Sequence, residues 1–143
     1  MGKSSNTADA YRLASQVGFN LRRANQRHVS IFSRYVDGLT PTQFATLARL
    51  YELGPLSQNK LGRQTAMDSA TIKGVVERLL AKDLLTLRPD QNDQRLRIVE
   101  LTEQGKAAFE TAHHQALQAR EETLDPLTAE EADMLEALLE KLV

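Results

Sequence analysis

The residues best suited to chemistry lie between Leu87 and Gly105, in the segment LRPDQNDQRLRIVELTEQG. Apolar residues that favour strands lie on either side of a central turn: Leu85 and Leu87 before it, and Leu96, Ile98 and Val99 after it. Between them stand residues that form tight turns: Pro89, Asp90, Asn92 and Asp93. Three arginines, Arg88, Arg95 and Arg97, flank the turn. The pattern predicts a β-hairpin with a cationic tip, followed by a helix that starts near Thr102.

Arginine at an exposed hairpin tip can enter a narrow minor groove of DNA, where the negative potential is concentrated. A nearby carboxylate can orient the guanidinium through a charge-assisted hydrogen bond, and Asp93 is placed to do so for Arg95. The alternative is a solvated hairpin with a surface salt bridge. The segment before the hairpin favours the DNA-binding interpretation.

That segment predicts a helix over Ser57–Gln64, a tight connection over Thr65–Asp68 and a longer helix over Ser69–Lys82. The longer helix has an apolar stripe at helical spacing, formed by Ile72, Val75, Val76, Leu79 and Leu80. The residues we expect to contact DNA from this helix are Ser69, Ala70, Thr71, Lys73, Gly74 and Arg78. Small residues would let the helix approach base edges, and the others supply hydrogen bonds and phosphate contacts. Two helices followed by a charged hairpin predict a winged helix-turn-helix whose wing contributes Arg88, Asp93, Arg95 and Arg97.

The chain resembles the MarR family of transcriptional regulators along most of its length. The matching segments are LTPTQF at 39–44, QNKLG at 58–62, MDSAT at 67–71 leading to Arg78-Leu79, and Asp93-x-Arg95 followed by Leu101-Thr102 and Gly105. One position departs from the pattern: Asp83 stands where the family usually has glycine at the end of the recognition helix. Asp tolerates the left-handed conformation less well than Gly but better than most residues. The resemblance implies a homodimer built by the terminal helices.

The expected fold is mainly α with a small β-hairpin wing, an α+β winged helix-turn-helix of six helices in one domain spanning residues 1–143. Residues 40–101 would form the DNA-binding region, with a second helix capped by Thr40 and Gln43 and ended by Gly54-Pro55. Residues 8–36 and 102–143 would form the dimerisation helices. Their apolar seam runs from Ala10 and Ala14 to Tyr35, and a capping box at Thr128 and Glu131 opens the last helix. The alternative is an intramolecular bundle without a dimer.

Family members commonly bind phenolic or aromatic carboxylates between the dimer helices and the winged domain. The resemblance therefore implies a ligand site, for which this sequence offers Arg22, Arg23, Arg27, His28, Phe32, Tyr35 and Phe44. Cations beside aromatic walls suit an aryl acid or its CoA thioester. In the alternative, His28 only supports the interface and the arginines form a solvated face.

Composition narrows the function classes further. The net charge is −1, but residues 60–97 carry eight Lys/Arg against five Asp/Glu, whereas residues 98–143 carry three against eleven. Phosphate contacts need local positive charge, so double-stranded DNA remains a fitting partner. There is no cysteine and no recognisable catalytic, metal or cofactor constellation, and no apolar run long enough for a membrane span.

We therefore expect a cytoplasmic, non-enzymatic, homodimeric repressor of a pseudo-palindromic operator, needing no cofactor or metal and released by a small aromatic acid or its CoA thioester. The alternative is a winged-helix protein-interaction or sequence-neutral DNA-binding module without an effector.

Overall fold

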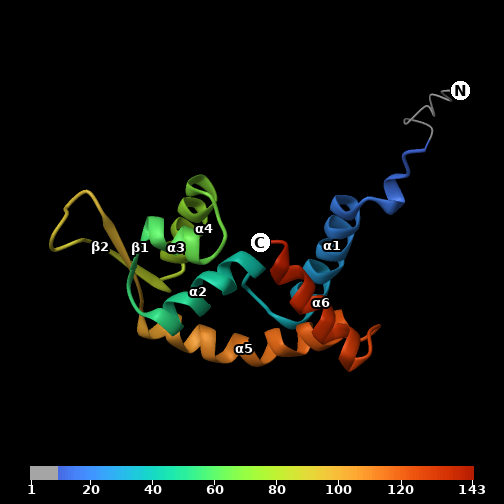
Figure 1. The fold of residues 1–143 in the computed structure, drawn as a ribbon. Coiled ribbons are helices and arrows are strands. Elements are labelled where there is room, and N and C mark those ends of the chain that lie inside the picture. The colour runs from blue at the N-terminus through green and yellow to red at the C-terminus, as the bar shows by residue number, and fades with distance from the viewer. Residues whose placement is uncertain (1–9) are drawn as a thin grey trace, which may run out of the picture.

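The computed structural model describes residues 10–143, and its elements form a winged lobe at one end of a long helix (Figure 1). The lobe comprises residues 40–101. The helices and strands, with one short 3₁₀ turn, are η1 (Leu13–Ser15), α1 (Val17–Tyr35), α2 (Pro41–Leu53), β1 (Leu56–Ser57), α3 (Gln58–Gln64), α4 (Ser69–Ala81), β2 (Leu85–Pro89), β3 (Arg97–Leu101), α5 (Glu103–Leu124) and α6 (Ala129–Lys141). Among the described residues, the six α-helices and the β2–β3 wing confirm the predicted fold class.

A three-stranded antiparallel sheet supports the wing, with β3 in the centre. Leu85 pairs with Leu101 and Pro89 with Arg97, so β2 and β3 are joined along their full length. The third strand, β1, is only two residues long and was not predicted from the sequence. It is defined by pairing with β3, where Leu56 lies opposite Val99. Because both residues are buried, this pair fixes the base of the wing to the lobe.

The core of the lobe lies where α2, α3 and α4 meet the sheet. Its buried members are Leu47, Leu50, Leu56, Leu61, Ile72, Val75, Val76, Leu79, Leu85 and Val99. Four of the five residues in the predicted stripe of α4 are buried here, and Leu80 packs against the same cluster. Burial of the stripe leaves the opposite side of α4 in solvent.

Side-chain caps start the helices where the sequence predicts. Thr40 and Gln43 form a reciprocal capping box with Pro41 at the first helical position, and Thr128 and Glu131 form a second box at α6. Thr102 caps α5 by accepting a hydrogen bond from the Gly105 N–H at 2.9 Å. Each cap satisfies an otherwise unpaired N–H and contributes on the order of 1 kcal/mol.

The first helix is shorter than predicted. It begins at Val17, so Ala10 and Ala14 of the predicted seam precede it. Gln16 has an extended backbone with ψ of 130° and makes no side-chain cap, and this interrupts the helical path after the 3₁₀ turn. The part of the dimerisation prediction that concerns residues 8 and 9 lies outside the described residues. At the position where this chain departs from the family's glycine, Asp83 does adopt the left-handed conformation, with φ of 60°.

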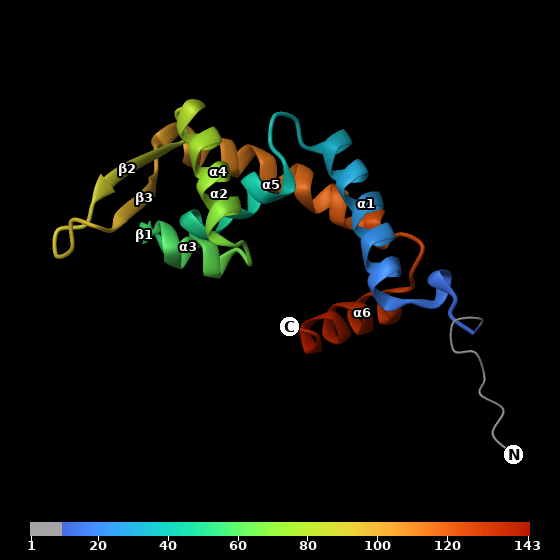
Figure 2. The same ribbon diagram turned by 90° about the horizontal axis from the view of Figure 1, so that it is seen from above.

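The terminal helices pack on one another outside the lobe. α1 crosses α5, burying Ile31, Phe32, Val36, Ala112 and Ala119 in a second cluster. α6 turns back from the end of α5 and, seen from above, stands apart from the lobe (Figure 2). No residue of α6 is buried. Within the described part of the chain, none of the helices is long and apolar enough to cross a membrane.

Candidate nucleic-acid interface

The N-terminus of α4 is held by the side chain of Asp68. Its carboxylate accepts a hydrogen bond from the Thr71 N–H at 2.7 Å. This bond, made to the charged form, lowers the pKa of Asp68 below its ordinary value of 3.8. This cap stabilises the first turn of α4, where Ser69, Ala70 and Thr71 lie.

The side of α4 opposite the core carries the residues predicted to contact DNA. Ser69, Ala70, Thr71, Lys73 and Arg78 are all exposed. Gly74 lies among them, half-buried, and a Cβ placed there would meet only the end of the Arg78 side chain, at 3.4 Å. This face of α4 therefore has small side chains near its N-terminal end and positive charge at Lys73 and Arg78. Such a surface can approach the base edges of a DNA groove closely while its cations contact the flanking phosphates.

The tip of the wing is organised by two aspartates. Asp90 accepts hydrogen bonds from the Asn92 and Asp93 N–H groups at 2.7 and 3.3 Å. Asp93 in turn accepts from the Arg95 side chain, with Nε to Oδ1 at 3.2 Å and Nη2 to Oδ2 at 3.5 Å. The predicted Asp93–Arg95 pair is confirmed. Because the Arg95 side chain is 91% exposed, the pair orients the guanidinium without removing it from solvent.

The other two wing arginines are partly engaged within the hairpin. Arg88 Nε lies 3.6 Å from the Glu100 carboxylate across the sheet, and Arg97 donates to the Gln94 carbonyl oxygen at 3.0 Å. These contacts brace the strands and the tip. Of the three arginines, Arg95 is the one that lies in the loop between β2 and β3 rather than in a strand.

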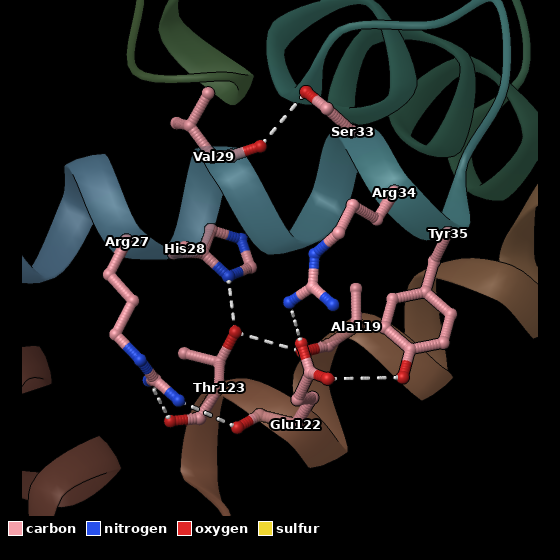
Figure 3. A network of polar contacts seen from close by, with 9 residues as sticks. All are labelled: Arg27, His28, Val29, Ser33, Arg34, Tyr35, Ala119, Glu122 and Thr123. Carbon is pink, nitrogen blue, oxygen red and sulfur yellow. Dashed lines mark hydrogen bonds and ion pairs between the residues drawn. The ribbon is translucent and has the colours of Figure 1, made fainter.

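The residues predicted to bind a ligand separate into three groups. Arg27, His28 and Tyr35 lie against the C-terminal end of α5 (Figure 3). Arg27 donates to the carbonyl oxygens of Thr123 and Glu122 at 2.7 and 3.1 Å, and Tyr35 donates to the Glu122 carboxylate at 3.4 Å. Arg34, which was not predicted, forms an ion pair with the same carboxylate. Figure 3 shows how these side chains converge on one turn of α5.

The tautomer of His28 follows from its hydrogen-bond partner. His28 Nδ1 and Thr123 Oγ1 are 2.8 Å apart, and the Thr123 hydroxyl already donates to the Ala119 carbonyl at 2.8 Å. Since a hydroxyl has one hydrogen, His28 donates from Nδ1 and its Nε2 is left as the acceptor of the neutral ring. The ring can thus accept a hydrogen bond at Nε2.

The second group, Phe32 and Phe44, belongs to a row of rings between the terminal helices and the lobe. The row runs His28, Phe32, Phe44, Phe109, His113, with neighbouring centroids 5.6 to 6.2 Å apart. Tyr51 lies 4.5 Å from Phe109 and donates to Glu110 at 3.0 Å, which raises the pKa of Tyr51 above 10.0. Phe109 and His113 were missed from the sequence. Their spacing of four residues on α5 was the available signal.

The third group, Arg22 and Arg23, lies elsewhere on α1. Both guanidiniums lie 5.6 Å from the ring of Phe19, and both residues are exposed. Within this chain they do not join Phe32 and Phe44. Because α1 carries these two arginines more than two turns away from Phe32, their part in a ligand site stays a prediction.

A winged helix-turn-helix with an exposed, partly cationic recognition helix defines a DNA-binding protein. The MarR family model matches residues 39–96. The transcriptional repressor NicR of Pseudomonas putida is 44% identical over 135 residues, covering 93% of this chain and 85% of NicR. The chain belongs to the MarR family of transcriptional regulators, whose members act by binding DNA and are not enzymes.

Solved structures agree with this assignment. A probable transcriptional regulator from Pseudomonas aeruginosa has a TM-score of 0.88 and 47% identity, covering 92% of this chain and 100% of that one. BpsR of Bordetella bronchiseptica also has a TM-score of 0.88, with 39% identity, covering 92% of this chain and 96% of BpsR. The DNA binding of BpsR is regulated by 6-hydroxynicotinic acid.

Proposed function

We propose that this protein is a homodimeric, cytoplasmic repressor that recognises a pseudo-palindromic operator and is released from it by a small aromatic carboxylate or its CoA thioester. DNA binding is supported by the presence, in one lobe, of an exposed face on α4 and an exposed Arg95 at the wing tip. The repressor role is supported by the similarity to NicR. We assign DNA contact to the predicted residues of α4 and of the wing.

Homodimerisation is supported by apolar side chains left in solvent on the terminal helices and on the segment that precedes α1. They are Tyr11, Leu13, Val17, Leu21, Met134, Leu135, Leu138, Leu139 and Leu142. Large exposed apolar surfaces mark interaction sites. A second copy that covers them would set two recognition helices about 34 Å apart, one turn of B-DNA, with the wings over the flanking minor grooves.

The row of aromatic rings supports an aromatic effector. Phe32 and Phe44 supply aromatic rings, and His28 supplies a hydrogen-bond acceptor at one end of the row. BpsR responds to 6-hydroxynicotinic acid, so a hydroxylated pyridine carboxylate is the first effector to test. A ligand carboxylate would compete with the α5 carbonyl oxygens for Arg27 and would loosen the α1–α5 contact. In the dimer, Arg22 and Arg23 would be further cations for the same acid.

Such a ligand releases DNA only to the extent that it binds the DNA-free conformation more tightly than the DNA-bound one. The aromatic row spans α1, α2 and α5. A ligand bound against these rings can therefore change the position of the lobe relative to the terminal helices. This location makes the row a suitable place for an effector to act.

The test is a gel-shift titration with the DNA upstream of the protein's own gene, against a scrambled duplex of equal length at near-physiological salt. A preference of roughly a thousandfold supports a specific regulator. Adding 6-hydroxynicotinic acid should then release the specific complex, whereas 2-hydroxypyridine, which lacks the carboxylate, should not. An aryl-CoA thioester is tested in parallel.

Each outcome has a distinct meaning. Equal, weak, salt-dependent binding to both duplexes would favour the sequence-neutral module. Specific binding that no aryl acid or aryl-CoA changes would remove the effector part of the proposal and leave the repressor part standing.

A further inference from the structure

The three residues after α4 connect the recognition helix to the rest of the molecule. Lys82 follows the last helical residue, and its ammonium group donates to the Gly38 carbonyl oxygen at 2.5 Å. The same ammonium lies 3.4 Å from Gln43 Oε1. One side chain thus joins the end of α4 to the turn between α1 and α2.

Both partners of Lys82 are held firmly in place. Gly38 has φ of 78°, a conformation that suits glycine, and lies in the turn that follows α1. Gln43 is only 6% exposed, and its Oε1 also accepts from the Thr40 N–H at 3.2 Å as part of the α2 capping box. The ammonium therefore bonds to a fixed point rather than to a mobile side chain.

The next two residues are fixed to the start of α5. The Asp83 carbonyl accepts from the Thr102 hydroxyl at 2.7 Å, and the Leu84 carbonyl accepts from the Thr102 N–H at 3.1 Å. Gly105 packs so closely that a Cβ there would lie 2.1 Å from the Leu84 oxygen. The end of α4 is thus connected to α5 through Thr102 and to the end of α1 through Lys82.

We infer that Lys82 is a positioning residue, whose bond to Gly38 sets the angle of the recognition helix relative to the terminal helices and so makes recognition of half-site spacing strict. The inference rests on the proposed dimeric operator binding and deepens it. In a dimer the terminal helices are fixed by the partner, so the angle between each lobe and those helices determines the distance between the two α4 helices. Inserting one base pair moves the half-sites apart by about 3.4 Å and rotates them by roughly 35°.

Lys82 is exposed, so its loss should leave the fold intact. It should instead widen the range of lobe angles. A wider range weakens binding to the correctly spaced operator, because a freely oriented lobe loses more entropy on docking, and it reduces the penalty for a wrong spacing.

The experiment uses a duplex enriched by the wild-type protein from a random library, versions of it with one base pair inserted or removed between the half-sites, and a single half-site. Lys82→Met keeps the length of the side chain and removes the ammonium. Lys106→Met is the matched control, because that lysine pairs with Glu103 inside α5 at 3.3 Å and makes no link to α1. Lys82→Arg restores a donor at the same place.

For Lys82→Met we expect about tenfold weaker binding to the correct spacing, a penalty for the wrong spacings about tenfold smaller than in the wild type, and unchanged half-site affinity. The salt slope should not change, and Lys82→Arg should restore the discrimination. Wild-type discrimination in Lys82→Met would overturn the inference. The inference would also be overturned if Lys82→Met bound the single half-site more weakly and its binding had a salt slope smaller by about one. That combination is the signature of a lost phosphate contact. If the wild type enriches no duplex, or shows no preference for spacing, the proposed function itself fails and the inference falls with it.

Discussion

Arg95 is the side chain at the wing tip whose exposure and orientation are both specified by the structure. Asp93 holds its guanidinium from one edge, and the side chain is otherwise in solvent. A cation presented in this way reaches a minor groove without first breaking a buried contact. The energetic role of Arg95 should therefore be found in DNA binding rather than in stability.

Arg95→Ala should weaken operator binding by about 1–3 kcal/mol, because the minor-groove contact and its electrostatic attraction are lost. Gel-shift titration at fixed salt measures the change, and sedimentation should show unaltered assembly. Lys106→Ala is the charge control on α5. Equal operator affinity in the wild type and Arg95→Ala would exclude a role for the wing tip.

Asp68 makes the start of the recognition helix sensitive to acid. Its pKa is lowered in the folded protein by the bond from the Thr71 N–H. A carboxylate with a lowered pKa stabilises the fold at every pH above its ordinary value of 3.8, and this stability is lost as the pH falls through the lower folded value. Asn also caps helices well but carries no charge to interact with the helix dipole.

Asp68→Asn should therefore melt at a lower temperature than the wild type at pH 7, and the difference should shrink as the pH falls below 3.8. Thermal unfolding followed by circular dichroism at several pH values tests this. A difference that stays constant to the most acidic condition would show that the charge of Asp68 contributes nothing to the cap.

At the scale of elements, the contact of α5 with the end of α4 leaves no room for a side chain at position 105. A Cβ there would lie 2.1 Å from the Leu84 carbonyl oxygen, and this oxygen is backbone, already bonded to the Thr102 N–H. Gly18 in α1 is the opposite case, since a Cβ there would lie in open space.

Gly105→Ala should cost about 3 kcal/mol or more of folding free energy, because two elements would have to separate. Gly18→Ala should instead stabilise α1 by up to about 1 kcal/mol, through reduced entropy of the unfolded chain. Urea denaturation at one fixed protein concentration compares the two variants. A Gly105→Ala variant as stable as the wild type would contradict the tight contact.

Elements that depend on local residues were predicted well. The caps at Thr40, Thr102 and Thr128 act within three residues, and α2, α5 and α6 begin where these local signals place them. The strand β1 was not predictable, because two residues become a strand only by pairing with β3. The same holds for the ring of Phe109, which stacks on Phe44 across more than sixty residues of sequence.

Predictions of contacts within the site were less complete for the same reason. Asp93 and Arg95 are two residues apart, so their pair could be read from the sequence. The partners of Arg27 and His28 are on α5, about 95 residues away, and nothing local identifies them. Arg88, Arg95 and Arg97 were all predicted to contact DNA in the same way. In the structure, Arg88 pairs with Glu100 and Arg97 donates to Gln94, so the three side chains are held differently.

At the scale of the whole molecule, α6 is the element whose presence a single chain does not explain. It has 13 residues, none of them buried, and a helix of that length is marginal in water without packing. Arg120 of α5 forms an ion pair with Glu136, but Met134 and Leu142 remain 64% and 66% exposed. A second copy packed on this face would supply the missing apolar contacts, in keeping with the proposed homodimer.

Replacing Leu138 and Leu142 together by Glu should therefore separate the dimer while leaving the core of the lobe intact. Sedimentation equilibrium should give the mass of one chain, against two for the wild type and for Glu140→Gln, the control on the same helix. The full operator should be bound on the order of 10²–10⁴-fold more weakly, because the second lobe no longer benefits from the high effective concentration of a tethered partner. Affinity for a single half-site should be retained, since α4 and the wing are unchanged. A wild-type protein that sediments as one chain, or a double variant that binds the full operator normally, would place the function in the single lobe and leave the exposed face of α6 for a different partner.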